Sequence, residues 1–193
     1  MKITEELSNA YYATKYLVYR NDGKKLILFA SGTSEDVKDF LESHQAKTCA
    51  FITAYNPESK MLSNSENLRR QMDLICSVGG KLVFYPGEGI NDKGDWPAEK
   101  SILILDISLE QAREIALKFE QTAFLFGDNL DKTELIATDA EEQNNLKHPL
   151  QRAGEELDKI LDATPFTEED ISDSKQVRVN FIPRRNNITT KPG

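Results

Sequence analysis

The sequence predicts an α/β or α+β fold in which three helices cover a single mixed β-sheet of about six strands. Short segments rich in β-branched and aromatic residues alternate with segments whose apolar residues recur at helical spacing. Turn and capping residues separate these segments. Apolar residues make up 39% of the 193 residues, and their regular patterning extends to about Ala137. One hydrophobic core is therefore expected up to that point.

The chain is expected to form a β-hairpin near its start. Residues 11–20 (YYATKYLVYR) alternate loosely and are rich in Tyr and Val, and residues 25–30 form a second apolar segment. The sequence Asn-Asp-Gly at 21–23 is a strong turn signal between them. A helix is expected to follow over residues 34–43, because its apolar residues have helical spacing.

The rest of the core alternates between strands and helices. Two further helices are expected, each opened by a capping box of Ser with Glu or Gln three residues later, at residues 63–78 and 108–119. Strands are expected at residues 48–54, 81–85, 101–107 and 123–127, with 134–138 as a weaker candidate. The Gly-rich residues 86–97 are expected to form a loop.

Charge divides the chain into a core domain, residues 1–137, and an extension, residues 138–193. Residues 128–173 hold 14 acidic and 4 basic side chains, a net charge of −10, whereas residues 174–193 hold five basic and no acidic ones. The extension is therefore predicted to be acidic, with a short helix at 150–161 and a flexible basic tail.

Composition excludes several classes of function. The net charge of −8 argues against nucleic acid binding by the core domain, because phosphate binding needs clustered Lys and Arg. The apolar runs are too short to span a bilayer, so a cytoplasmic protein that does not engage membranes is expected. Cys49 and Cys76 are expected to be buried free thiols. His44 and His148 lack metal-ligand spacing, and no cofactor fingerprint is present, so neither metal nor cofactor is expected.

Polar residues gather where one predicted strand ends and the next helix begins. Thr53 and Asn56 lie at the strand end, and Ser63, Asn67 and Arg70 share one stripe of the helix. A helix N-terminus favours an anion, and a guanidinium nearby would complete a carboxylate or phosphate site. The stripe therefore predicts a binding site for an anionic ligand.

Three of these residues also have a structural interpretation. Ser63 is explained by capping alone, and Asn56 before a proline is ordinary turn chemistry. Arg70 is placed to pair with Glu66 one helical turn earlier. From the residues themselves, the functional and structural interpretations both stay open.

Two residues of the Gly-rich segment are further candidates. Trp96 is the chain's one tryptophan, and it is interpreted as a lid, a ligand-stacking face or a plug over the core. Glu99 lies close to the start of the next strand, where a carboxylate would be held rigidly.

At these positions the chain resembles the bacterial domain-of-unknown-function family 3293. The segment FITAYNPESKMLSNSEN at 51–67 matches that family's main motif. Three shorter motifs agree in order: YxxTxY at Tyr11–Tyr16, DWPxE at Asp95–Glu99 and QxA-[FI] at Gln121–Phe124. The resemblance covers about residues 11–137, and it implies an uncharacterised bacterial protein with no established activity.

The resemblance also implies which positions match the family's motifs. These are Thr53, Asn56, Pro57, Ser59, Ser63, Glu66, Asn67, Arg70, Trp96, Glu99 and Gln121. Two departures stand out: Ala98-Glu99 replaces the usual acidic pair, and Glu120 replaces the usual Gly.

Three functions compete, and the sequence does not settle whether the protein is an enzyme. The first is a small-molecule-binding or regulatory module whose anionic ligand contacts Thr53, Asn56, Ser63, Asn67, Arg70, Trp96, Glu99 and Gln121. The second is an enzyme that uses Glu99 as general acid or base and Arg70 as an electrostatic clamp. The third is an interaction or inhibitory protein whose acidic residues 128–173 engage a basic protein partner.

Overall fold

The structure is a computed structural model that describes residues 2–91, 97–128 and 132–163. The strands of these residues are β1 (Thr14–Tyr19), β2 (Lys25–Leu28), β3 (Ser31–Thr33), β4 (Thr48–Thr53), β5 (Phe84–Asn91), β6 (Glu99–Leu105), β7 (Ala123–Asp128) and β8 (Lys132–Ala137). Their helices are α1 (Glu5–Tyr12), α2 (Glu35–Ser43), α3 (Asn64–Val78), α4 (Leu109–Lys118) and α5 (Pro149–Ala163), with short 3₁₀ helices η1 (Pro57–Ser59) and η2 (Ala140–Asn145).

By its internal contacts the chain divides into two units, Met1–Arg152 and Ala153–Gly193. The first unit contains the whole sheet and includes residues 138–152, which the charge pattern assigned to the extension. Gln143 of η2 accepts a hydrogen bond from the backbone N–H of Ala137, at 2.7 Å. In the described part of the second unit, α5 carries a surface ion pair between Lys159 and Glu156. Among the described residues, no helix combines the length and apolar character needed to cross a lipid bilayer.

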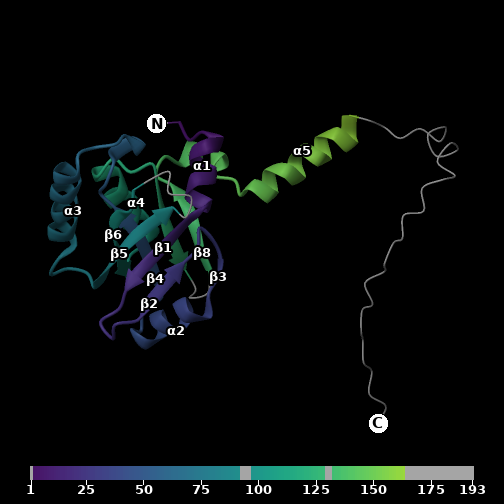
Figure 1. Ribbon diagram of the computed structural model, residues 1–193. Coiled ribbons are helices and arrows are strands. Elements are labelled where there is room, and N and C mark those ends of the chain that lie inside the picture. Colours follow the sequence, from purple (N-terminus) through teal and green to yellow (C-terminus); the bar gives the residue numbers. More distant parts are fainter. Residues whose placement is uncertain (1, 92–96, 129–131, 164–193) are drawn as a thin grey trace, which may run out of the picture. The chain divides into compact units, whose positions relative to one another are not determined.

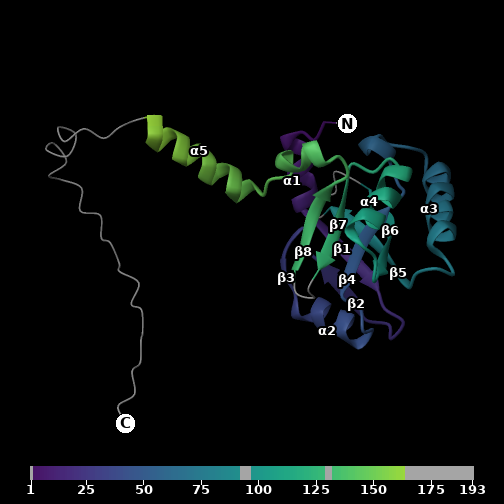
Figure 2. The same cartoon turned by 180° about the vertical axis from the view of Figure 1, so that it is seen from behind.

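All eight strands of the described residues form one antiparallel sheet, in the order β2-β1-β5-β6-β4-β7-β8-β3. The two edge strands, β2 and β3, are consecutive in the chain, and Phe29 and Ala30 alone separate them. The backbone N–H of Leu135 in β8 donates to the carbonyl of Ala30, at 3.0 Å. The sheet is therefore strongly curled, as Figures 1 and 2 show.

The mixture of helices and strands predicted from the sequence is confirmed, but the details are corrected. The sheet is antiparallel and not mixed, and the described residues contain eight strands and five α-helices in place of about six and three. The three-residue strand β3 is polar, so it gives no apolar alternation to detect. The predicted hairpin is present, with β1 and β2 paired around the Asn-Asp-Gly turn.

Two further corrections concern segments with misleading local composition. The predicted strand at 11–20 begins with the last turn of α1, whose N-cap Thr4 accepts a hydrogen bond from the N–H of Leu7. The predicted loop at 86–97 begins inside β5, which continues to Asn91 between β1 and β6. Aromatic residues in a helix and glycines in a strand both oppose their usual preferences, and tertiary packing overrides them.

The curled sheet has two separate apolar cores, one on each face. The inner core contains inward side chains of the strands, such as Val18, Leu103 and Leu125. The outer core contains Ile52 and Ile104 and is covered by α3 and α4. Helix α2 also packs into the inner core, and α1 and α2 lie at opposite ends of the sheet in both views (Figures 1 and 2).

The two cysteines differ in exposure, which corrects the expectation that both are buried. Cys49 is buried in the inner core, whereas Cys76 is exposed on α3. Burial raises the pKa of the Cys49 thiol to about 12, so its reactive thiolate is scarce near neutral pH. In the native protein, iodoacetamide is expected to alkylate Cys76 and to leave Cys49 unmodified, as peptide mass mapping would measure. In denaturant both should react; equal native labelling would contradict the packing of β4.

Candidate functional site

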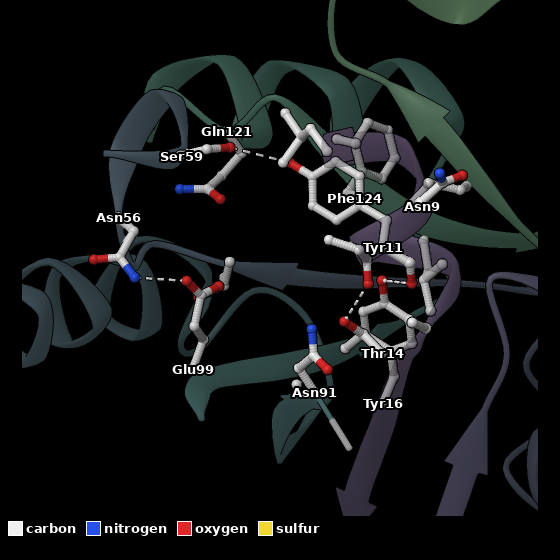
Figure 3. A pocket seen from close by; sticks show the side chains of 18 of the residues that line it. Asn9, Tyr11, Thr14, Tyr16, Asn56, Ser59, Asn91, Glu99, Gln121 and Phe124 are labelled. Carbon is white, nitrogen blue, oxygen red and sulfur yellow. Dashed lines mark hydrogen bonds between the residues drawn. The ribbon is translucent and has the colours of Figure 1, made fainter. Parts of the chain in front are cut away.

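A cavity of about 910 Å³ lies inside the curled sheet at the end where α1 packs. Because side chains alternate along a strand, the inward positions of neighbouring strands form a continuous belt. Across the sheet, the belt pairs are Thr14 with Asn91, Gly89 with Glu99, Ser101 with Thr53, Phe51 with Leu125, and Leu125 with Leu135. All of these residues line the cavity, together with residues of α1 such as Asn9 and Tyr11 (Figure 3).

The cavity has an apolar floor and a polar rim. Phe51, Leu125 and Leu135 line it and belong to the buried inner core, so they form the floor. Glu99 and Ser101 occupy the inward positions at the start of β6, before Leu103 and Leu105 enter the core. The rim therefore carries hydrogen-bonding groups, and polarity falls with depth.

Glu99 is held at the rim by Asn56, whose Nδ2 donates to Glu99 Oε1 at 2.6 Å (Figure 3). The opposite end of the Asn56 amide fixes this orientation. Asn56 Oδ1 accepts from the N–H of Leu62 at 3.0 Å and from Nδ2 of Asn67 at 2.8 Å. Since two donors face that oxygen, the nitrogen must face the Glu99 carboxylate.

The turn that presents Asn56 is conformationally strained. Asn56, Glu58 and Ser59 have φ values of 46°, 50° and 56°, in the left-handed region that residues other than glycine rarely adopt. Such conformations persist where surrounding contacts impose them, and they concentrate at functional sites. Here Asn67 Oδ1 accepts from the N–H of Asn56, and the carbonyl of Glu120 accepts from the N–H of Glu58.

Arg70 lies on the same helix as Asn67 but does not line the cavity. Its guanidinium donates to the carbonyls of Ala54 at 2.9 Å and Phe119 at 2.6 Å, and pairs with the Glu120 carboxylate at 3.2 Å. Arg70 therefore links the end of β4 to the C-terminus of α4.

The predicted capping box at the start of α3 is confirmed. Ser63 Oγ accepts from the N–H of Glu66, and the Glu66 carboxylate accepts from the N–H of Ser63. Both residues are exposed, and neither lines the cavity. Helix capping thus accounts for the hydrogen bonds between Ser63 and the first turn of α3.

Thr53 and Gln121 line the cavity and also bond to the backbone around it. Thr53 Oγ1 donates to the carbonyl of Lys100 at 2.7 Å. Gln121 Nε2 donates to the carbonyl of Tyr55 at 2.9 Å, and its side chain is buried. Both residues therefore have their positions fixed by main-chain contacts.

Several lining residues were not among the candidates from the sequence, above all Tyr11, Thr14 and Tyr16. Tyr11 Oη lies 3.3 Å from Ser59 Oγ, and Tyr16 Oη donates to the carbonyl of Tyr11 at 2.9 Å. Strand alternation places Thr14 and Tyr16 on one face of β1, but the sequence does not show that this face is concave.

Burial raises the pKa of both Tyr11 and Tyr16 above the usual value for a phenol. The negative charge of Glu99 adds to the increase at each residue. Both hydroxyls are therefore protonated at neutral pH, and they offer hydrogen bonds rather than a base.

Of the eight predicted site residues, four line the cavity: Thr53, Asn56, Glu99 and Gln121. Three do not: Ser63 caps α3, Asn67 bonds to Asn56, and the Arg70 guanidinium bonds to the carbonyl of Ala54. Trp96 lies outside the described residues.

The described lining is acidic. Glu5, Glu6 and Glu99 contribute carboxylates, and no Lys, Arg, His or Cys is among the described residues that line the cavity. Glu5 forms an ion pair with Arg152 at 3.3 Å. Within the described parts of the chain, no three His, Cys, Asp or Glu residues are grouped so that they could hold a metal ion. The described lining residues thus offer carboxylates, amides and hydroxyls.

Comparison with known proteins gives one match. The family described as "Protein of unknown function (DUF3293)" matches residues 52–124. The resemblance expected from the motifs is therefore confirmed over those residues, and the Tyr11–Tyr16 motif lies outside them. No curated protein and no solved structure matches the chain.

All four motifs that indicated the DUF3293 resemblance contribute residues to the cavity. The main motif supplies Phe51, Thr53, Asn56 and Ser59; YxxTxY supplies Tyr11, Thr14 and Tyr16; DWPxE supplies Glu99; and QxA-[FI] supplies Gln121, Ala123 and Phe124. Figure 3 shows how side chains from these distant segments surround one open space. Segments far apart in the DUF3293-like sequence thus meet at a single place in the fold.

Proposed function

We propose that this protein binds a small molecule in the cavity of its curled sheet. The observation that carries the proposal is the convergence of all four motifs on that cavity, which fold stability alone does not require. Its volume of about 910 Å³ lies within the usual range of roughly 300–1,000 Å³ for small-molecule sites. An apolar floor with a few fixed polar groups is also typical of such sites.

The contacts favour binding or regulation over catalysis. The enzyme hypothesis needs Arg70 beside Glu99, but the Arg70 guanidinium bonds to Ala54, Phe119 and Glu120 outside the lining. The Asn56 amide donates to Glu99 Oε1 and orients the carboxylate at the rim, as suits a residue that positions a ligand. The interaction hypothesis for residues 128–173 stays a separate prediction, because residues 129–131 and 164–173 lie outside the described residues.

Filling the cavity should abolish binding. Gly89 lines it, and a Cβ added there would be 3.5 Å from its nearest neighbour, Thr14 Cγ2. Valine suits a strand, so Gly89→Val is expected to fold while its side chain occupies the cavity. A ligand at 100 times its Kd should stabilise the natural protein by about 2.7 kcal/mol, or roughly 5–10 °C in Tm, and should not stabilise the variant.

Thermal shift against a panel of amines, nucleosides, amino acids and fatty acids would measure this effect, with native mass spectrometry of the purified protein alongside. Gly89→Ala is the matched control, because its single methyl group leaves most of the cavity open and should preserve the shift. A ligand that raises the Tm of Gly89→Val as much as that of the natural protein would place its site elsewhere and contradict the proposal.

A further inference from the structure

We infer that α1 is a lid on the cavity, and that a holding segment, residues 142–152, keeps this lid closed from its outer side. The inference rests on the proposed function and adds the route by which a molecule enters the same site. Three features carry it: the share of the lining that α1 contributes, the contacts between α1 and the holding segment, and the small apolar surface that fixes α1 in place.

Two kinds of wall enclose the cavity in the described residues. One consists of strands, which are bound to one another by backbone hydrogen bonds and cannot part without breaking the sheet. The other is α1 with its flanking residues: from Thr4 to Ala13, every residue except Ser8 and Tyr12 lines the cavity (Figure 3). Ala13 alone separates α1 from β1, and hinges commonly lie at such residues between elements. Of these two walls, α1 is therefore the one that can move.

The holding segment contacts the face of α1 that is turned away from the cavity. Ser8 and Tyr12 lie one helical turn apart, so they share a face, and neither lines the cavity. Ser8 Oγ donates to the carbonyl of Lys147 at 3.4 Å, and Tyr12 Oη donates to the carbonyl of Leu146 at 3.2 Å. The Tyr12 ring also meets the His148 ring edge to face, with centroids 5.1 Å apart. These contacts thus act on the lid from outside.

Arg152 adds a second set of outer contacts. Its Nη1 donates to Asn9 Oδ1 at 3.1 Å, and the guanidinium pairs with the Glu5 carboxylate at 3.3 Å. Its Nη2 donates to the carbonyl of Asn145 at 3.2 Å, which ties these contacts to the rest of the holding segment. Since Glu5 and Tyr12 are the first and last residues of α1, the holding segment contacts the lid at both ends.

Little apolar surface fixes α1 otherwise. Isolated helices shorter than about 12–15 residues are marginal in water, and α1 has eight residues, of which Ser8 is buried and Tyr11 and Tyr12 are partly buried. Ile3, directly before α1, is a buried anchor in the inner core, and its N–H donates to Glu142 Oε2 at 2.7 Å. A segment held by one such anchor and by exposed or partly buried hydrogen bonds opens more easily than a strand inside the sheet.

The test measures opening of the cavity by the rate at which a thiol inside it is alkylated. Ser101→Cys places that thiol in the lining, at a side chain that is buried, and Cys76→Ser removes the exposed native thiol. N-ethylmaleimide is the probe, and peptide mass mapping over time gives the rate at each position. When the lid closes faster than the probe reacts, this rate follows the population of the open state.

Two lid substitutions, Tyr12→Phe and Arg152→Ala, are then combined in this background; neither changes a lining residue. Because they remove outer contacts of α1, they are expected to raise the alkylation rate at position 101 about tenfold. Cys49 is the internal control, since it is buried in the inner core outside the lining, and its rate should not change. Arg69→Ala is the matched variant: it removes an exposed ion pair within α3 and should leave both rates as they were.

Faster alkylation at position 101 with an unchanged rate at Cys49 supports the lid. An unchanged rate at position 101 would overturn the inference, because α1 would then not control entry. Equal acceleration at both positions would overturn it too, since the substitutions would then open the whole sheet. The experiment uses no ligand, so its outcome is independent of the binding proposal: a lid without a ligand, or a ligand without a lid, would be recognised as such.

Discussion

Replacing Arg70 by alanine is expected to lower the free energy of unfolding by about 3 kcal/mol. Its side chain is 17% exposed, and its guanidinium donates to the carbonyls of Ala54 and Phe119, both in buried residues. Without it, each carbonyl loses a charge-assisted hydrogen bond, and a buried polar group without its partner is destabilising by about 1–3 kcal/mol. The exposed contact with Glu120 adds little, because solvent screens it. Urea denaturation followed by circular dichroism would measure the change.

Arg69 provides a matched control on the same helix. Its side chain is 70% exposed and pairs with Asp73 one turn later. Arg69→Ala is therefore expected to change stability by less than about 0.5 kcal/mol. If the two variants were equally stable, the linking role of Arg70 would be wrong, and a ligand-binding role would regain support.

The polar stripe of α3 illustrates how far a helical wheel can be interpreted. The wheel correctly places Asn67 and Arg70 on one face of the helix, and Gln71 lies beside them. That face contacts the rest of the protein: Gln71 Oε1 accepts from the N–H of Ala54, and Asn67 exchanges hydrogen bonds with Asn56. The spacing of residues in the sequence determines which side of a helix each side chain occupies, but tertiary packing determines what that side chain contacts.

Local signals predicted the elements that local interactions determine. The two capping boxes and the hairpin turn are satisfied within a few residues, so the sequence contains the whole interaction. The curl is different, because it depends on β8 pairing with β3 about 100 residues earlier in the chain. The three polar residues Ser31–Thr33 form no sequence pattern that predicts pairing with such a distant strand.

The candidate site was predicted only in part, because local motifs show some of its residues and long-range strand pairing brings in the others. Thr53, Asn56, Glu99 and Gln121 belong to motifs that the sequence displays, and all four line the cavity. Tyr16, Asn91 and Ser101 were missed, although strand alternation determines which face each one occupies. Which face is concave follows from the curl, and hence from long-range pairing. The segment that begins at Phe51 supplies one wall of the cavity, while α1, β1 and β5 supply much of the rest.

Replacing Gly87 by alanine is expected to destabilise the protein by about 3 kcal/mol, through overpacking at the floor of the cavity. A Cβ at this position would lie 2.5 Å from the carbonyl oxygen of Leu17 and 2.6 Å from Cε2 of Phe51. The oxygen belongs to the neighbouring strand β1 and cannot move without disturbing its pairing with β5.

Gly89 is the matched control for this prediction, two positions along the same face of β5. A Cβ there would meet Thr14 Cγ2 at 3.5 Å, an ordinary contact, so Gly89→Ala should be neutral or stabilising by up to about 1 kcal/mol. Thermal and urea unfolding of the two variants would measure the difference. Both glycines leave room in the sheet, but Gly87 makes room for the Phe51 ring and Gly89 for the cavity. Equal stabilities would mean that Phe51 does not pack on β5, and the assignment of Phe51 to the cavity floor would then be wrong.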